Sequence, residues 1–195
     1  MSALPKIPIR MTVAEFFAWN PPSAQLWQLV DGEPQAMAPA NRTHGAVQNE
    51  LGRLIANYLE ERGGPCTVVT TPGVIPHVQS ETNVRIPDLA VTCSSYDAEE
   101  SALNDPVLLI EILSPSNQAE TWANVWAYAT IPSVREILIL KTAAIGAELL
   151  RRNQDGSWPS QPEAIAAGDE LTLESIGFRI PLAAAYRTTR LAANT

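Results

Sequence analysis

Residues 107–116 read VLLIEILSPS, an apolar run that holds a single carboxylate, Glu111, and stops at Ser-Pro-Ser. A short run this apolar is typical of a strand that is buried on both faces of a sheet. A glutamate is almost never fully buried unless another group pairs with it. The run therefore predicts a sheet covered on both faces, with an unusual carboxylate inside one of its central strands.

The residues before this strand predict one hairpin and one long helix. A short helix is expected over residues 12–19, where Thr12 and Glu15 fit a capping box. QLWQLV and EPQAMA flank Asp31-Gly32, a dipeptide typical of a tight hairpin turn. Apolar side chains at spacings of three and four predict an amphipathic helix over residues 43–62, closed by two glycines.

The remaining segments complete an α/β pattern. Extended segments are expected at CTVVTTP, GVIPHV and DLAVTC, before the strand VLLIEIL. A helix over residues 117–130 and the strand VREILIL follow, then a strand pair formed by residues 146–152 and 169–175, and a short C-terminal helix in LAAAYRTTRL. This order predicts a mixed β-sheet between helices, and the length of 195 residues predicts a single domain over residues 1–195.

Composition narrows the class of protein. No apolar run approaches the roughly 18 residues of a membrane helix, and the N-terminus lacks the apolar stretch of a signal peptide, so no membrane partner and a cytoplasmic location are expected. The net charge of −8 argues against a broad basic surface for nucleic acid, although a local basic patch is compatible with it. Cys66 and Cys93 have no metal-ligand spacing and are expected as buried thiols.

A second carboxylate stands close to Glu111 in the predicted sheet. Asp88 leads directly into the apolar segment LAVTC, and strands that follow each other in sequence usually lie close in space. Two such carboxylates form the kind of oxygen site that Mg²⁺ prefers. Arg85 or Arg135 could instead pair with them in a buried ion pair, which is the simpler reading of the spacing alone.

Several blocks of the chain, taken together, resemble a known family. LWQLVDGEPQAMAP, THGAVQNELGRLIANYL, RIPDLAVTC, VLLIEILSPSNQ and YATIPSVREILIL occur in this order between residues 11 and 140. The series is similar to the Uma family of putative restriction endonucleases, within the PD-(D/E)XK nuclease superfamily. The resemblance implies a restriction-endonuclease-like αβββαβ core with an N-terminal β-hairpin. It also implies Asp88 and Glu111 as ligands of Mg²⁺ or Mn²⁺, and hydrolysis of DNA phosphodiester bonds.

The chain departs from the pattern of this family at positions that matter chemically. Gln28 stands where members usually carry glutamate, and Leu113 where the superfamily has its lysine. Asn124 stands where the family often has a lysine one helical turn before a tyrosine, here Tyr128. A positioned lysine orients water and offsets transition-state charge. Leucine can do neither, and asparagine can donate a hydrogen bond but brings no charge.

The resemblance therefore implies a site built from Asp88 and Glu111 and completed by Gln28 and Asn124. His44, at the start of the long helix, is a further candidate as a base or hydrogen-bond donor, although a histidine at such a position is more often only an exposed polar residue.

Three functions remain open on the sequence. One is a metal-dependent endonuclease acting on DNA, weakened by the loss of the lysine. The second is a catalytically degenerate binding or interaction module on the same fold, and the third is a hydrolase of another phosphate ester. Analogy with the fold also predicts a homodimer.

Overall fold

A computed structural model describes residues 10–95, 100–115 and 117–194. The elements in its N-terminal part are α1 (Val13–Ala18), β1 (Trp27–Val30), β2 (Glu33–Ala36), α2 (Arg42–Arg62), β3 (Thr67–Thr70) and β4 (Leu89–Thr92). The elements that follow are β5 (Pro106–Leu113), α3 (Gln118–Tyr128), β6 (Glu136–Lys141), β7 (Gly146–Arg151), β8 (Glu163–Ala166), β9 (Glu170–Leu173), β10 (Phe178–Pro181), and the short 3₁₀ helices η1 (Leu182–Tyr186) and η2 (Ala192–Asn194).

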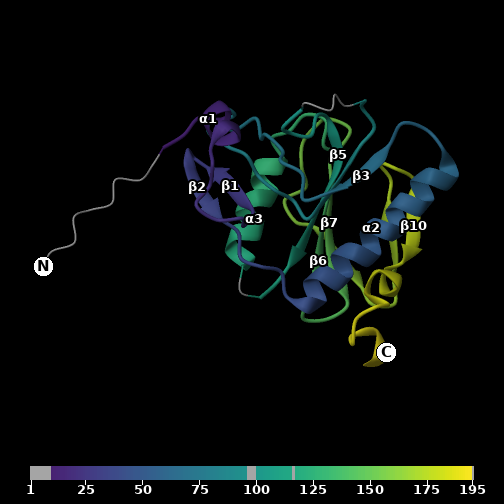
Figure 1. The fold of residues 1–195 in the computed structure, drawn as a ribbon. Helices are drawn as coiled ribbons and strands as arrows, with labels where there is room; N and C mark the ends of the chain where they lie inside the picture. Colours follow the sequence, from purple (N-terminus) through teal and green to yellow (C-terminus); the bar gives the residue numbers. More distant parts are fainter. Residues whose placement is uncertain (1–9, 96–99, 116, 195) are drawn as a thin grey trace, which may run out of the picture.

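A mixed sheet forms the centre of the fold (Figure 1). Its strand order is β3-β4-β5-β6-β7-β8, and its neighbours run antiparallel except for the parallel pair β5 and β6. A parallel pair needs a crossover connection, which α3 provides. The series α2-β3-β4-β5-α3-β6 is the αβββαβ core that the sequence predicted, so this fold prediction is confirmed.

The alternating side chains of β5 supply two separate cores. Leu108, Ile110 and Ile112 belong to the cluster that contains the buried residues of α2. Leu109 and Leu113 belong to the cluster that contains the buried residues of α3. Each buried side chain of this kind contributes about 1.5–3 kcal/mol, and a slip of one residue would exchange the two faces. The packing therefore fixes the register of β5, and with it the face on which Glu111 lies.

The N-terminal segments form as the sequence predicted. Thr12 and Glu15 make both hydrogen bonds of a capping box at the start of α1. Asp31 and Gly32 adopt φ of 50° and 85° in the turn between β1 and β2, which is the conformation that an Asp-Gly hairpin supplies. Leu29 pairs through its backbone with Val84, and this pairing holds the hairpin beside the segment that leads to β4.

Three predictions of secondary structure are wrong in detail. GVIPHV is not a strand but contributes one bridge, between Val74 and Arg85, because Pro76 interrupts its hydrogen bonding. β7 pairs with β8 rather than with residues 169–175, which instead supply β9 for a separate hairpin with β10. LAAAY forms a 3₁₀ helix, and residues 187–191 form turns and a bend before η2.

The expectation of two buried thiols is also wrong. Cys66 and Cys93 form a disulfide with Cα atoms 3.8 Å apart. The register pairs Thr67 with Thr92, so the two cysteines lie one step beyond this pair at the end of β3 and β4. They are 27 residues apart in the chain, and only the strand pairing brings them together.

We expect reduction of this disulfide to lower the free energy of unfolding by about 3 kcal/mol, because the bond closes a long loop in the unfolded chain. Urea unfolding with and without dithiothreitol measures the difference. The double variant Cys66→Ala, Cys93→Ala should unfold at the same urea concentration under both conditions. Equal stability of oxidised and reduced wild type would contradict this expectation.

Within the part of the chain that the structure describes, no helix combines the length and apolarity needed to cross a bilayer.

Candidate active site

Asp88 immediately precedes β4, and Glu111 lies on the neighbouring strand β5. The pairing of β4 with β5 has Leu89 against Ile110 at this end, so Asp88 and Glu111 are the next residues beyond that pair. They are close enough for the charge of Asp88 to act on the pKa of Glu111. Both residues are more than nine-tenths buried, with exposures of 8% and 7%. The sheet therefore brings together the two carboxylates that the sequence singled out.

Asp88 is held by the first turns of α2 and by the backbone of β5. The Nε2 atom of His44 lies 2.7 Å from one carboxylate oxygen, and the amide of Ile112 donates to the other over 2.7 Å. Gln48 donates to the backbone carbonyl of Asp88 over 2.8 Å. These contacts fix the orientation of the carboxylate, and a carboxylate has enough lone pairs to accept a further ligand.

Glu111 contacts the helix that covers its face of the sheet. The Tyr128 hydroxyl donates to its Oε1 atom over 2.7 Å. The pKa of Glu111 is raised to about 8, mainly by burial and next by the nearby charge of Asp88, whereas the hydrogen bonds from Tyr128 and Asn124 act in the opposite direction. Burial, followed by the charge of Glu111, also raises the pKa of Tyr128 well above its ordinary value. Tyr128 therefore stays protonated and remains a hydrogen-bond donor.

Gln28 projects from β1 toward the start of α3. Its amide nitrogen donates to Glu120 over 2.9 Å, which assigns the other end of the amide as the carbonyl oxygen. This oxygen is buried and accepts no hydrogen bond in the described part of the chain. The charge of Glu120 contributes to the raised pKa of Glu111, so the three side chains share one region. A buried oxygen without a donor normally has an unseen partner, such as a water molecule or a cation.

Arg85 is buried beside this region but does not pair with the carboxylates. Its guanidinium donates to the side-chain oxygens of Asn124 over 3.2 Å and Asn83 over 3.0 Å. Its Nε atom is buried without a partner among the described residues, and burial lowers its pKa. Arg85 therefore orients Asn124, whose hydrogen bond in turn reaches Glu111.

The alternative of a buried ion pair is wrong for both candidate arginines. Across residues 10–95, 100–115 and 117–194, no lysine or arginine lies within 4.0 Å of Asp88 or Glu111, and the only ion-pair geometry at either is His44 with Asp88. Arg85 is bound to asparagines, and Arg135 is exposed at the opposite end of the sheet, before β6.

Leu113, where a lysine was expected from the superfamily, packs in the core against α3. The two carboxylates therefore have no compensating cation from lysine or arginine in the described chain.

The oxygen atoms present fit a hard divalent cation better than a softer metal. Among the described residues, no three His, Cys, Asp or Glu side chains gather closely enough to form a complete cage. Two carboxylates and the free amide oxygen of Gln28 supply oxygen ligands only. Mg²⁺ commonly takes one or two carboxylates and completes its shell with water and phosphate oxygens. The unpaired oxygen of Gln28 is the observation that favours such a cation.

Sequence reasoning proposed all five candidate residues for one site but missed the contacts that orient them. His44 contacts Asp88, Asn124 hydrogen-bonds to Glu111, and the charge of Asp88 acts on the pKa of Glu111. Gln28 joins it through Glu120. The donation from Tyr128 to Glu111 had a sequence signal, because Asn124 and Tyr128 are four residues apart and share one face of α3.

We predict that the stability of the metal-free protein falls as pH rises from about 5 to 8. The raised pKa of Glu111 means that the folded protein holds its proton more tightly than the unfolded chain, so stability is lost as that proton leaves. The loss should be at most about 1.4 kcal/mol per pH unit for one proton. Urea unfolding in EDTA measures it.

Glu111→Gln should flatten this dependence, whereas Glu60→Gln, on the exposed face of α2, should leave it unchanged. A wild-type profile as flat as that of Glu111→Gln would show that Glu111 titrates normally.

Comparison with known proteins places the chain in a family. Residues 13–183 match the Uma2 family, described as "Putative restriction endonuclease". The chain is 27% identical over 180 residues to "Uncharacterized protein slr1290" of Synechocystis sp., covering 91% of this chain and 92% of that protein. A solved structure of a "putative nuclease belonging to DUF820" from Anabaena variabilis superposes with a TM-score of 0.73 at 14% identity, over 91% of this chain and 98% of that one. The likeness of the two folds and the match along most of the sequence agree, and the chain belongs to the Uma2 family.

Proposed function

We propose that the protein is a metal-dependent endonuclease that hydrolyses DNA phosphodiester bonds. The observation that carries the proposal is the neighbouring pair of buried carboxylates, Asp88 and Glu111, which have no lysine or arginine partner in the described chain. Two neighbouring buried carboxylates without a lysine or arginine partner are costly to the fold, which favours a role in binding a cation. Membership of the Uma2 family and the nuclease-like fold agree with this chemistry.

Asp88 and Glu111 would hold Mg²⁺ or Mn²⁺, with the free oxygen of Gln28 as an additional ligand or as a partner for a water molecule in its shell. When bound, such a cation stabilises charge on a phosphoryl group and lowers the pKa of the attacking water. Release of the proton of Glu111 is required before it can bind a cation, because a ligand carboxylate must be ionised.

The protein's other side chains hold these ligands in place. Tyr128 donates to the Oε1 atom of Glu111 and restrains the carboxylate. His44 restrains Asp88 through Nε2, so that its Nδ1 atom is the ring nitrogen left for a water or substrate proton. Asn124 donates toward Glu111 and is itself oriented by Arg85. Because it is bound to Asn124, Arg85 holds a positive charge near the site, although it does not contact the carboxylates.

A second candidate is a DNA-binding module that does not cleave. The observation in its favour is Leu113, which fills the expected lysine position with core packing. Asn124 offers a hydrogen bond but no charge. On this proposal the fold and the acidic pair would persist while cleavage is lost. A homodimer in the cytoplasm is expected for either candidate, from fold analogy and from composition.

We predict Mn²⁺-dependent nicking of plasmid DNA by the wild type and a loss of about 10²–10⁴-fold in Asp88→Asn and Glu111→Gln. These substitutions preserve shape while removing the charge needed to hold the cation. Glu60→Gln, exposed on α2, is the matched control and should cut like the wild type. Equal cutting by all four proteins would point to a contaminant, and no cutting at high protein concentration would favour the binding module.

Gln28→Glu should tighten binding of Mn²⁺ by about tenfold, because a carboxylate replaces a neutral oxygen ligand. In EDTA the same variant should be less stable than the wild type, since it adds a third acidic group close to Glu111 and Glu120. Calorimetric titration and thermal unfolding give the two values. Unchanged affinity for Mn²⁺ would place Gln28 outside the ligand set.

A further inference from the structure

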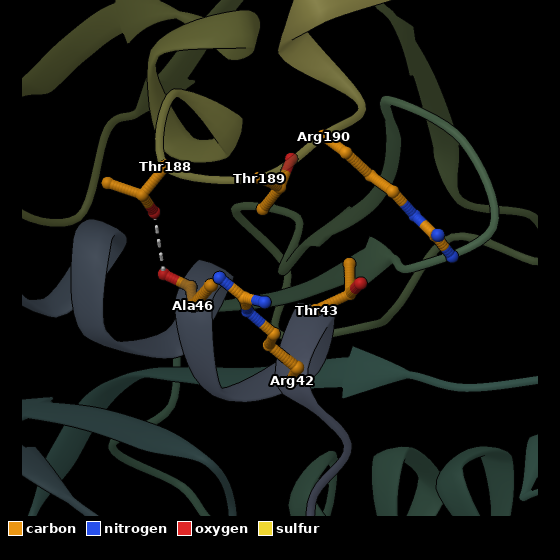
Figure 2. A pocket seen from close by; sticks show the side chains of 6 residues that line it. All are labelled: Arg42, Thr43, Ala46, Thr188, Thr189 and Arg190. Atoms are coloured by element: carbon orange, nitrogen blue, oxygen red, sulfur yellow. Dashed lines mark hydrogen bonds between the residues drawn. The ribbon is translucent and has the colours of Figure 1, made fainter.

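A separate cavity lies on the opposite side of the first turns of α2 from Asp88. Its volume is about 370 Å³, and it is lined by Arg42, Thr43 and Ala46 of α2 and by residues 188–190 near the C-terminus. Figure 2 shows the two segments facing each other, joined by a hydrogen bond of 3.4 Å from the Thr188 hydroxyl to the carbonyl of Ala46. Residues more than 140 positions apart in sequence therefore build one pocket.

The two arginines of this cavity are uncompensated. Both Arg42 and Arg190 are exposed, and in the described ranges no carboxylate lies within 4.0 Å of either guanidinium. The neighbouring Arg53 and Arg187, in contrast, both pair with the buried carboxylate of Glu50, over 2.8 and 2.9 Å. The protein has a net charge of −8, so two unpaired arginines give this cavity a charge opposite in sign to that of the whole protein.

The position of Arg42 works against the stability of α2. It occupies the first residue of the helix, and the first turn contains no acidic residue. The positive end of the helix dipole disfavours a cation there. An anion in the cavity would offset this repulsion and would also meet the hydroxyl of Thr43, for which the described structure gives no partner. The chemistry of the lining thus fits a phosphate group, which arginine binds through paired N–H donors.

The geometry of α2 relates this cavity to the candidate active site. Arg42 and Ala46 are four residues apart and share one face, whereas His44, which contacts Asp88, lies about 200° around the helix from Arg42. The two sites are thus separated by about the 10 Å width of a helix. That separation corresponds to a few nucleotides along one strand of DNA.

We infer that the cavity formed by Arg42, Thr43 and residues 188–190 binds a backbone phosphate of DNA, a few nucleotides from the bond that meets Asp88 and Glu111. The inference rests on the proposed function for its choice of ligand, because a free phosphate would satisfy the same side chains. It gives this acidic protein a local contact for DNA and explains why an arginine stands at the start of α2.

Binding of a labelled DNA duplex, measured by fluorescence anisotropy in EDTA over a series of salt concentrations, tests the inference without requiring cleavage. Arg42→Ala with Arg190→Ala should weaken binding about tenfold at low salt and reduce the salt slope by about one. Arg42→Glu with Arg190→Glu should weaken it further. Arg135→Ala is the matched control, an exposed arginine at the far end of the sheet, and should bind like the wild type.

The glutamate variant separates lost binding from lost folding. Glutamate is favoured at the start of a helix, so its melting temperature should equal or exceed that of the wild type while its DNA binding falls. Wild-type affinity and salt slope in both double variants would overturn the inference, as would a wild type that binds no DNA. If inorganic phosphate raises the melting temperature of the wild type but DNA does not bind, the cavity is a site for free phosphate and the inference is wrong.

The outcomes are distinguishable from failure of the proposed function. Weakened DNA binding by the variants, with no cleavage by the wild type, would support the cavity and reject the nuclease. Mn²⁺-dependent cleavage by the wild type, with unchanged DNA binding by the variants, would support the nuclease and reject the cavity as a DNA contact.

Discussion

The buried carboxylate of Glu111 is the constraint on which the rest of the site depends. It occupies a position on β5 where its neighbours on the same face, Leu109 and Leu113, pack in the core. The register with β4 then sets Asp88 beside it. With no arginine or lysine within 4.0 Å of either carboxylate in the described chain, the hydrogen bond from Tyr128 and a raised pKa are what make the burial of Glu111 tolerable. Either a bound proton or a bound cation neutralises the buried negative charge of Glu111.

The architecture around this position was largely predictable because its signals are local. The apolar run of β5, the long amphipathic α2 and the Asp-Gly turn each specify an element from a few adjacent residues. The pairing partners of the strands were less predictable from the sequence. β7 pairs with β8 rather than with residues 169–175. The alternation of side chains along β7 does not indicate which segment will pair with it. The disulfide depended on the same missing information, since only the pairing of β3 with β4 places Cys66 beside Cys93.

The residues of the candidate site were predictable from local signals, but the contacts between them were not. Asp88 and Glu111 were identifiable because a carboxylate next to or inside an apolar strand is unusual in any sequence, and the family resemblance gave them a role. Their expected pairing with Arg85 did not occur, because that side chain is taken up by Asn83 and Asn124. The contact between Gln28 and Glu120 joins β1 to α3 across 92 positions and has no local signature. Long-range side-chain contacts of this kind decide the chemistry and require the assembled fold.

The most direct test of this account is a crystal of the wild-type protein soaked in Mn²⁺ at pH 8.5 and examined by anomalous diffraction, with a Glu111→Gln crystal treated identically. The account predicts an anomalous peak within coordination distance of both Asp88 and Glu111 in the wild type, and its loss in the variant. A wild-type map with no peak there, in which Tyr128 still donates to Glu111 and His44 still contacts Asp88, would contradict the claim that the acidic pair exists to bind a cation.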